Sequence, residues 1–271
     1  MKVIAALVHK VAHELRLFCI AVQFLTRVPV PRVLGFEPDW LNQSARHFPA
    51  VGFGVGAVAA LVLVAAAQVF PPAVAVGLSM AATLCLTGGF HEDGLADTFD
   101  ALGGAVSRER ALAIMKDSRI GSYGAIALVV VLGLKAATLS SLSDSSLAQA
   151  AAVLLLAHSA SRSAAVLLIR ALAYAGDLDH AKAKPLARRV SAGGAAVALG
   201  WSALVGAGLV WRAPAQAISI AAGLALGGVG ALACAGWLRR RLGGYTGDGL
   251  GATQQITELL VLLGWLAASA R

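Results

Sequence analysis

The densest acidic segment of the chain, residues 87–100, carries the carboxylates best spaced for chemistry. Asp93, Asp97 and Asp100 are separated by four and three residues, which on a helix places them within an arc of about 60°. Three carboxylates on one face repel one another unless a cation lies between them, and hard oxygen ligands favour Mg²⁺ shared with substrate phosphates. Glu92 lies about 100° from this face and could supply a further contact to the metal.

A solvated acidic helix face is the alternative interpretation of this segment. An apolar stretch precedes it directly, so its carboxylates are expected near membrane depth, where ionisable groups are costly. His91 could act as a general base or bind zinc. With no cysteine beside it and several carboxylates around it, a general base or a structural histidine is favoured.

A basic segment, residues 115–124, follows the acidic one along the chain. Lys116 and Arg119 could hold a phosphate from the side opposite the metal, because charge-assisted hydrogen bonds bind phosphate oxygens strongly. Asp117 could add a ligand or orient Arg119. The alternative is that these positive charges only set the topology of a membrane protein.

A glycine-rich segment near the C-terminus is the third candidate. Gly247 and Gly251 flank Asp248 in a stretch that we predict to be a loop just before an apolar helix. Glycines let backbone N–H groups approach an anion closely, and a helix N-terminus favours negative charge. Gln254 and Glu258, one turn apart at the start of that helix, strengthen the prediction, although an ordinary flexible loop would also account for the glycines.

The composition indicates which elements must position these side chains. Hydrophobic residues make up 58% of the 271 residues and charged residues 13%, and the mean hydropathy is +0.77. A soluble domain normally carries about twice that charge. Candidate spans are predicted at about 51–69, 73–90, 124–141, 148–172, 193–211, 215–237 and 255–269. The last is short and could be tilted, re-entrant or packed inside the bundle.

These runs predict an all-α, polytopic integral membrane helical bundle with about six to seven spans. We expect one membrane domain, residues 1–271, with an N-terminal interfacial and cytoplasmic segment over 1–47 and a transmembrane bundle over 48–271. Apolar residues at a helical period over 3–25, with charged residues elsewhere on the wheel, are typical of an amphipathic helix in the membrane interface.

The distribution of Lys and Arg predicts the orientation. The N-terminal region, the end of the fourth run and the long connections 91–123, 173–192 and 238–254 hold 18 of the 22 Lys and Arg residues. The others are Lys135, Arg162, Arg212 and Arg271. The positive-inside rule therefore places the long connections in the cytoplasm. The net charge of +8 is explained by this rule and by anionic lipids and substrates, so no nucleic-acid partner is expected.

Five stretches together resemble a known family. They are Thr26-Arg27-x-Pro29-x-Pro31, Phe48-Pro49-x-Val51-Gly52, His91-Glu92-Asp93-Gly94-Leu95-Ala96-Asp97, Lys116-Asp117-Ser118-Arg119-Ile120-Gly121 and Gly244-Tyr245-Thr246-Gly247-Asp248-x-x-Gly251-Ala252. In order, spacing and topology they resemble adenosylcobinamide-GDP ribazoletransferase, also called cobalamin-5′-phosphate synthase. The resemblance extends from about residue 18 to residue 260.

The resemblance implies Mg²⁺-dependent joining of adenosylcobinamide-GDP to α-ribazole or its 5′-phosphate, with release of GMP, at a bacterial inner membrane. The expected metal ligands are Asp93, Asp97, Asp100 and Glu92. The expected phosphate-binding residues are Lys116, Arg119, Arg27, Gly247 and Gly251. The general base could be Asp97, Asp100, Asp248 or His91. Besides the lipid bilayer, a second copy of the chain and other enzymes of cobalamin synthesis are expected partners.

Two rival functions are open at this point. A CDP-alcohol phosphotransferase also clusters acids on membrane helices, but the acidic segment matches its motif, Asp-x-x-Asp-Gly-x-x-Ala-Arg, poorly. A transporter would place acids at the bilayer midplane and would show broken helices in paired halves. No internal repeat is evident in the sequence, and the acids cluster at one face.

Overall fold

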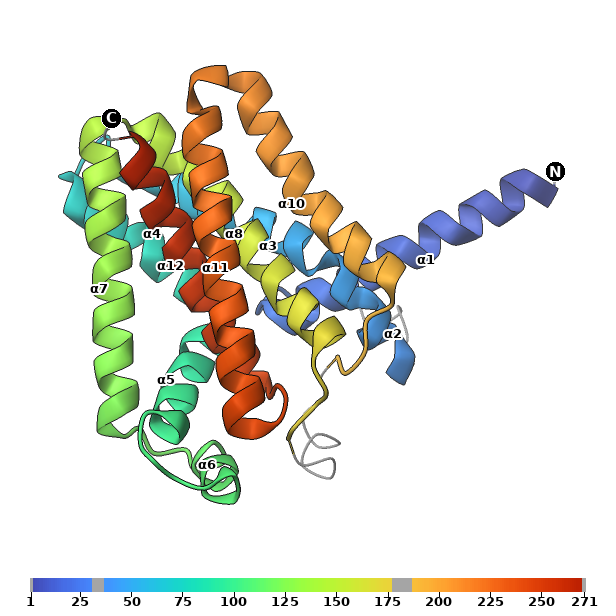
Figure 1. Ribbon diagram of the computed structural model, residues 1–271. Coiled ribbons are helices and arrows are strands. Elements are labelled where there is room, and N and C mark those ends of the chain that lie inside the picture. Colours follow the sequence, from blue (N-terminus) through green and yellow to red (C-terminus); the bar gives the residue numbers. More distant parts are fainter. Residues whose placement is uncertain (1, 31–36, 177–186, 270–271) are drawn as a thin grey trace.

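A computed structural model describes residues 2–30, 37–176 and 187–269, and within these ranges the chain is almost entirely helical (Figure 1). The helices are α1 (Lys2–Leu25), α2 (Pro38–Ser44), η2 (Ala45–His47), α3 (Phe48–Ala66), α4 (Pro72–Thr87), α5 (Phe90–Leu102), α6 (Arg108–Ile114), α7 (Ser122–Ser145), α8 (Leu147–Ala171), α10 (Ala192–Arg212), η3 (Pro214–Gln216), α11 (Ala217–Leu242) and α12 (Gly247–Ser269). Pro31 of the first motif, the middle of the 173–192 connection and Arg271 lie outside the described residues.

Five stretches of the described chain are long and apolar enough to cross a membrane. They are Asp39–Ala66, Ser122–Ser145, Leu147–Ala171, Ala192–Arg212 and Pro214–Leu242. Helices α4 and α5 pass the same test together but meet at an angle of 89°, and counting them as one broken span gives six. The predicted all-α, polytopic membrane bundle is therefore confirmed, at the lower end of the predicted number of spans.

Helix α12, which contains the seventh predicted span, is packed inside the bundle. It contacts α5, α7, α8 and α11, and Val261, Leu262 and Trp265 are fully buried. The neighbouring helix α11 approaches it closely because α11 has glycine at the contact: a Cβ atom on Gly223 would lie 2.8 Å from the Val261 carbonyl oxygen. Small residues allow such close helix packing without a hydrophobic driving force from water.

The long connections meet at one end of the bundle, the lower end in Figure 1. The Arg108 guanidinium donates to the Leu242 carbonyl at 2.7 Å and to the Ala175 carbonyl at 3.3 Å. Arg241 in turn donates to the Leu102 carbonyl at 2.8 Å. The expectation that these connections share one side is therefore confirmed for their described parts.

Helix α1 has two different halves. Its C-terminal half packs on the bundle, where Leu17 and Ala21 are fully buried. Its N-terminal half projects away from the bundle (Figure 1), and the side chains of Leu7, Val11 and Leu15 are 62%, 51% and 60% exposed. These residues form a single apolar stripe, as an amphipathic helix in the membrane interface requires.

Candidate active site

The site is built on a sharp elbow between α4 and α5. Gly88 and Gly89 have φ angles of 75° and 71°, in the left-handed region that glycine adopts without strain. They end α4 three residues before the predicted limit of that span and turn the chain through 89° into α5. The acidic residues therefore do not continue an apolar span, as the sequence suggested, but begin a new helix.

Arg27 covers this elbow. Its backbone N–H donates to the Leu86 carbonyl at 2.8 Å, and its guanidinium packs so closely on Gly88 that a Cβ atom there would collide with Nε. A glycine at this position therefore leaves the space that the guanidinium occupies. The structure thus brings the Thr26-Arg27 motif to the acidic motif, about sixty residues later in the chain.

Arg27 and the acidic helix line one cavity of about 560 Å³. Asp93 and Asp97, one turn apart on α5, lie in its wall together with Glu92. The remaining lining residues are Thr87, Gly88, Gly89, Phe90, Ala96, Ser118, Ile120 and Leu128. The predicted shared face of Asp93 and Asp97 is thus observed, with a guanidinium in the same cavity.

Asp100 has a different position from the other two aspartates. Its carboxylate accepts hydrogen bonds from the Gly121 N–H at 2.7 Å and the Gly124 N–H at 2.8 Å. Both N–H groups belong to the start of α7, where backbone donors lack partners within the helix. Asp100 is not among the residues that line the cavity, and its observed contacts fix α7 to α5. Its predicted roles as metal ligand and base are untested.

The glycine-rich segment is helical where a loop was predicted, because α12 begins at Gly247 rather than near residue 255. Gly251 therefore lies on the second turn of α12 and faces Gly94 of α5. A Cβ atom on Gly94 would lie 3.1 Å from the Asp248 Cα and 3.2 Å from the Gly251 Cα. The backbone of Asp248 is therefore close to the acidic helix, as expected. The glycines let α5 and α12 approach each other closely, whereas the sequence suggested that they let an anion approach a loop.

The basic segment borders the cavity through Ser118 and Ile120. Arg119 is 86% exposed and forms an ion pair with Asp117 at 2.6 Å. Hydrogen bonds from Arg119 lower the pKa of the Asp117 carboxyl to about 2. Lys116 is exposed near the start of the same segment. Neither Lys116 nor Arg119 lines the cavity in this structure, so their phosphate-binding role is still a prediction.

His91 faces away from the acidic cavity. It is 5% exposed and lines a separate cavity of about 30 Å³ with Arg162 and Gln254. Gly247 and Gly251 line this small cavity as well. The His91 ring contacts the Phe90 ring edge-on, with 5.3 Å between the ring centroids, and this contact holds the imidazole inside the bundle. His91 is not among the described residues that line the acid-lined cavity, and its role as a base is untested.

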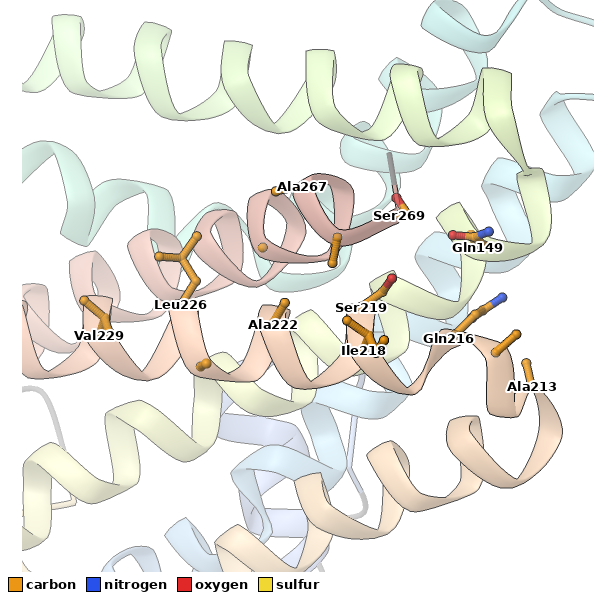
Figure 2. A pocket seen from close by; sticks show the side chains of 14 residues that line it. Gln149, Ala213, Gln216, Ile218, Ser219, Ala222, Leu226, Val229, Ala267 and Ser269 are labelled. Carbon is orange, nitrogen blue, oxygen red and sulfur yellow. The ribbon is translucent and has the colours of Figure 1, made fainter. Parts of the chain in front are cut away.

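A larger groove of about 1090 Å³ lies at the opposite end of α11 and α12 (Figure 2). Figure 2 shows Ile218, Ala222, Leu226 and Val229 along one side of it, with Ala267 opposite. No charged side chain is among the described residues that line this groove. An apolar groove without acids or bases offers no groups for phosphate chemistry, so the elbow cavity is the candidate active site.

Comparisons with known proteins support this assignment. A family model described as cobalamin-5-phosphate synthase matches residues 17–266. A protein named adenosylcobinamide-GDP ribazoletransferase from Leptothrix cholodnii is 62% identical over 256 residues, covering 94% of this chain and 96% of that protein. The chain belongs to the cobalamin-5-phosphate synthase family. Relatives with the same name from Shewanella amazonensis and Vibrio cholerae are 44% and 45% identical, over 92% and 94% of this chain and 94% and 95% of their own lengths. No solved structure matches the chain.

Membership of this synthase family confirms the resemblance found in the sequence motifs, and it makes the chain a transferase of cobalamin synthesis. The matched region, residues 17–266, includes every element that lines the elbow cavity. It also includes most of α12, so the close contact of Gly94 and Gly251 lies within the family region.

The carboxylates that line the elbow cavity suit a magnesium ion whose coordination would be completed by substrate phosphates. Among the described residues, no three His, Cys, Asp or Glu side chains form a metal-holding group by themselves. Asp93, Asp97 and Glu92 nevertheless line one cavity, and Glu92 Oε2 is buried without a hydrogen-bond partner in the described part of the chain. Mg²⁺ usually keeps several waters and binds through one or two carboxylates together with substrate phosphates.

Sequence reasoning missed a buried group of charged residues behind the cavity. Lys135, His158, Arg162 and Glu258 are each at most 6% exposed and come together from α7, α8 and α12. In the sequence, Lys135 and Arg162 stand out only as exceptions to the charge asymmetry. Because a charge at membrane depth requires a partner, the position of these two residues within apolar helices is the feature from which a buried charged group could be predicted.

Proposed function

We propose that this chain transfers adenosylcobinamide phosphate from adenosylcobinamide-GDP to α-ribazole or its 5′-phosphate, and that GMP is the other product. The relatives named above supply the substrate, since their name specifies adenosylcobinamide-GDP and a ribazole acceptor. The observation that carries the proposal is the elbow cavity, where Arg27, Asp93 and Asp97 lie together. A guanidinium facing carboxylates suits a pyrophosphate held between a cation-binding wall and a donor.

The proposed reaction is an in-line displacement at the phosphorus that is attached to cobinamide. The ribose hydroxyl oxygen of the acceptor forms the new bond to this phosphorus, and the bond from phosphorus to the bridging oxygen breaks. GMP leaves with the bridging oxygen. Phosphoryl transfer of this kind depends mainly on positioning and on stabilisation of the phosphate charge.

Arg27 would bind non-bridging oxygens of the pyrophosphate through its guanidinium, which the elbow glycines hold at the cavity. Mg²⁺ bound by Asp93 and Asp97 would neutralise the pyrophosphate and the charge that develops in the transition state. Glu92 would supply a further contact to the metal from the inner wall of the cavity.

The hydroxyl proton must pass to a base in reach of the cavity. Asp97 lines the cavity, and the backbone of Asp248 lies against α5 beside it. Asp100 is engaged by two backbone N–H groups, and His91 faces the other side of α5. We therefore favour Asp97 or Asp248 as the base over Asp100 or His91.

We also propose that the cavity opens to the cytoplasm of a bacterial inner membrane. The charge asymmetry of 18 in 22 Lys and Arg residues supports this orientation, because positive charge is retained on the cytoplasmic side. The acidic helix begins at the elbow and continues to the end of the bundle where the long connections meet (Figure 1).

A product assay tests the proposal. Purified protein is incubated with adenosylcobinamide-GDP, α-ribazole and Mg²⁺, and chromatography follows GMP and the corrinoid products. We expect GMP and a complete cobalamin in equal amounts, and no product when EDTA is added. α-Ribazole 5′-phosphate is tested in parallel to compare the two acceptors. GMP release that does not require the acceptor, or cobalamin formation in EDTA, would contradict the proposal.

A further inference from the structure

The buried charged group behind the cavity is centred on Glu258 of α12. Its Oε1 lies 2.6 Å from Lys135 Nζ, and its Oε2 lies 2.9 Å from His158 Nδ1 and 3.8 Å from Arg162 Nη1. Glu258 is only 2% exposed. Buried charges are retained in proteins when they are paired and hydrogen-bonded, so Glu258 fixes α7 and α8 to α12.

The positive and negative charges within this group do not cancel. Lys135 and Arg162 carry two positive charges, and Glu258 carries one negative charge. The next carboxylate in the hydrogen-bond network is Glu92, which lines the elbow cavity and is linked to the group through Gln255. An ionised Glu92 therefore supplies the second negative charge, so the charge of a cavity residue is coupled to the interior of the bundle.

The link through Gln255 has one chemically consistent orientation. Lys135 Nζ can only donate, and it donates to Gln255 Oε1 at 3.1 Å. An ionised Glu92 can only accept, and its Oε1 accepts from Gln255 Nε2 at 2.9 Å. Reversing the amide would oppose donor to donor at Lys135 and acceptor to acceptor at Glu92. Lys135 thus sets the amide orientation, and the amide sets the position of the Glu92 carboxylate.

We propose that Gln255 is a positioning residue for the reaction, which fixes the Glu92 carboxylate in the cavity wall so that it can stabilise the divalent cation or its bound water. This inference rests on the proposed Mg²⁺-dependent transfer. Gln255 holds Glu92 through Oε1 only, and Oε2 has no hydrogen-bond partner in the described residues. That second oxygen is the acceptor left for the cation or its water.

Replacing Gln255 by methionine tests this role. Gln255→Met keeps the side-chain length and removes the three side-chain hydrogen bonds of Gln255, to Lys135, Glu92 and Gln254, while Lys135 keeps its contact with Glu258. We expect the Mg²⁺ concentration for half-maximal activity to rise about tenfold to a hundredfold, as when an outer partner of a metal ligand is lost. Mn²⁺ binding, followed by electron paramagnetic resonance with adenosylcobinamide-GDP present and the acceptor withheld, should weaken by a similar factor.

A double-mutant cycle shows whether Gln255 acts through Glu92. In a Glu92→Gln background, Gln255→Met should change the Mg²⁺ requirement less than about twofold, since the carboxylate to be positioned is gone. Ser202→Ala is the control, because it removes buried hydrogen bonds to Ser159 and Ser163, and none of these three serines lines the cavity. It should lower thermal stability without changing the Mg²⁺ requirement.

The outcomes separate this inference from the proposed function. An unchanged Mg²⁺ requirement and Mn²⁺ affinity in a folded Gln255→Met protein would overturn the positioning role, and so would full additivity with Glu92→Gln. Wild-type protein that turns over in EDTA would instead overturn the proposed metal dependence. If Gln255→Met does not fold, Gln255→Asn replaces it: this shorter amide cannot reach both Lys135 and Glu92, and it should raise the Mg²⁺ requirement while remaining polar.

Discussion

Substituting alanine for Gly94 tests the contact on which the site depends. An added Cβ atom would lie 2.9 Å from the Asp248 carbonyl oxygen, 3.1 Å from the Asp248 Cα and 3.2 Å from the Gly251 Cα. All three are backbone atoms, so no side-chain rotation can relieve the overlap. Ordinary contact begins at 3.4 Å, so α5 and α12 must separate by about half an ångström at this crossing.

The separation should affect activity more than stability. Overpacking of a core typically costs about 1–3 kcal/mol. Alanine recovers about 1 kcal/mol of that through its higher helix propensity. A misplacement of about 1 Å in an active site can cost about a hundredfold in rate. For half that displacement we expect turnover to fall about tenfold to a hundredfold, while the protein still folds and inserts.

Initial rates of GMP release from purified protein measure the effect, and thermal unfolding in detergent measures stability. Gly77→Ala is the matched control, because a Cβ atom on Gly77 of α4 would have no neighbour within 4 Å. It should leave activity within about twofold and keep or raise stability. Wild-type rates in a folded Gly94→Ala protein would refute the close-contact reasoning, as would an equal loss in Gly77→Ala.

Three further predictions concern the acids and the orientation. Asp93→Asn and Asp97→Asn should each lower turnover by about a hundredfold or more without loss of helical content, measured by rate assay and circular dichroism; near-normal activity in both would reject a shared metal site. Asp248→Ala should lower turnover about a hundredfold because it removes a carboxylate carried by a residue that contacts the acidic helix, whereas a change in thermal stability alone would make Asp248 structural. In a chain without native cysteines, cysteine at Ser107 should be protected from an impermeant thiol reagent outside intact cells and cysteine at Ala215 should react; the reverse pattern would invert the proposed orientation.

The local chemistry of the site could be predicted from the sequence. The spacing of Asp93 and Asp97 predicts a shared helix face, because side-chain direction on a helix depends only on position along it. The composition predicts a polytopic helical bundle for a similar reason: the length and hydropathy of a run decide whether it can cross a bilayer. Both predictions hold in the structure.

Helix ends that depend on glycine were harder to predict. Gly88 and Gly89 could have continued a helix, and only their left-handed conformation turns the chain into α5. The sequence predicts a loop at Gly247 and Gly251, but both are helical, and Gly251 packs directly on Gly94 of α5. Glycine permits a turn, a loop or a close helix contact equally well, and its neighbours in space select among these.

The pairing of distant residues was decided only by the tertiary structure. Nothing in the local sequence relates Lys135 to Glu258, since they are 123 positions apart and belong to different helices. The burial of both at the contact of α7 and α12 makes them partners, because an unpaired charge there would be too costly. The same packing places Gln255 between Lys135 and Glu92. The sequence thus determined the class of protein and the acidic face, and helix packing determined which residues support that face, because hydrophobic periodicity specifies a buried side but not its partner.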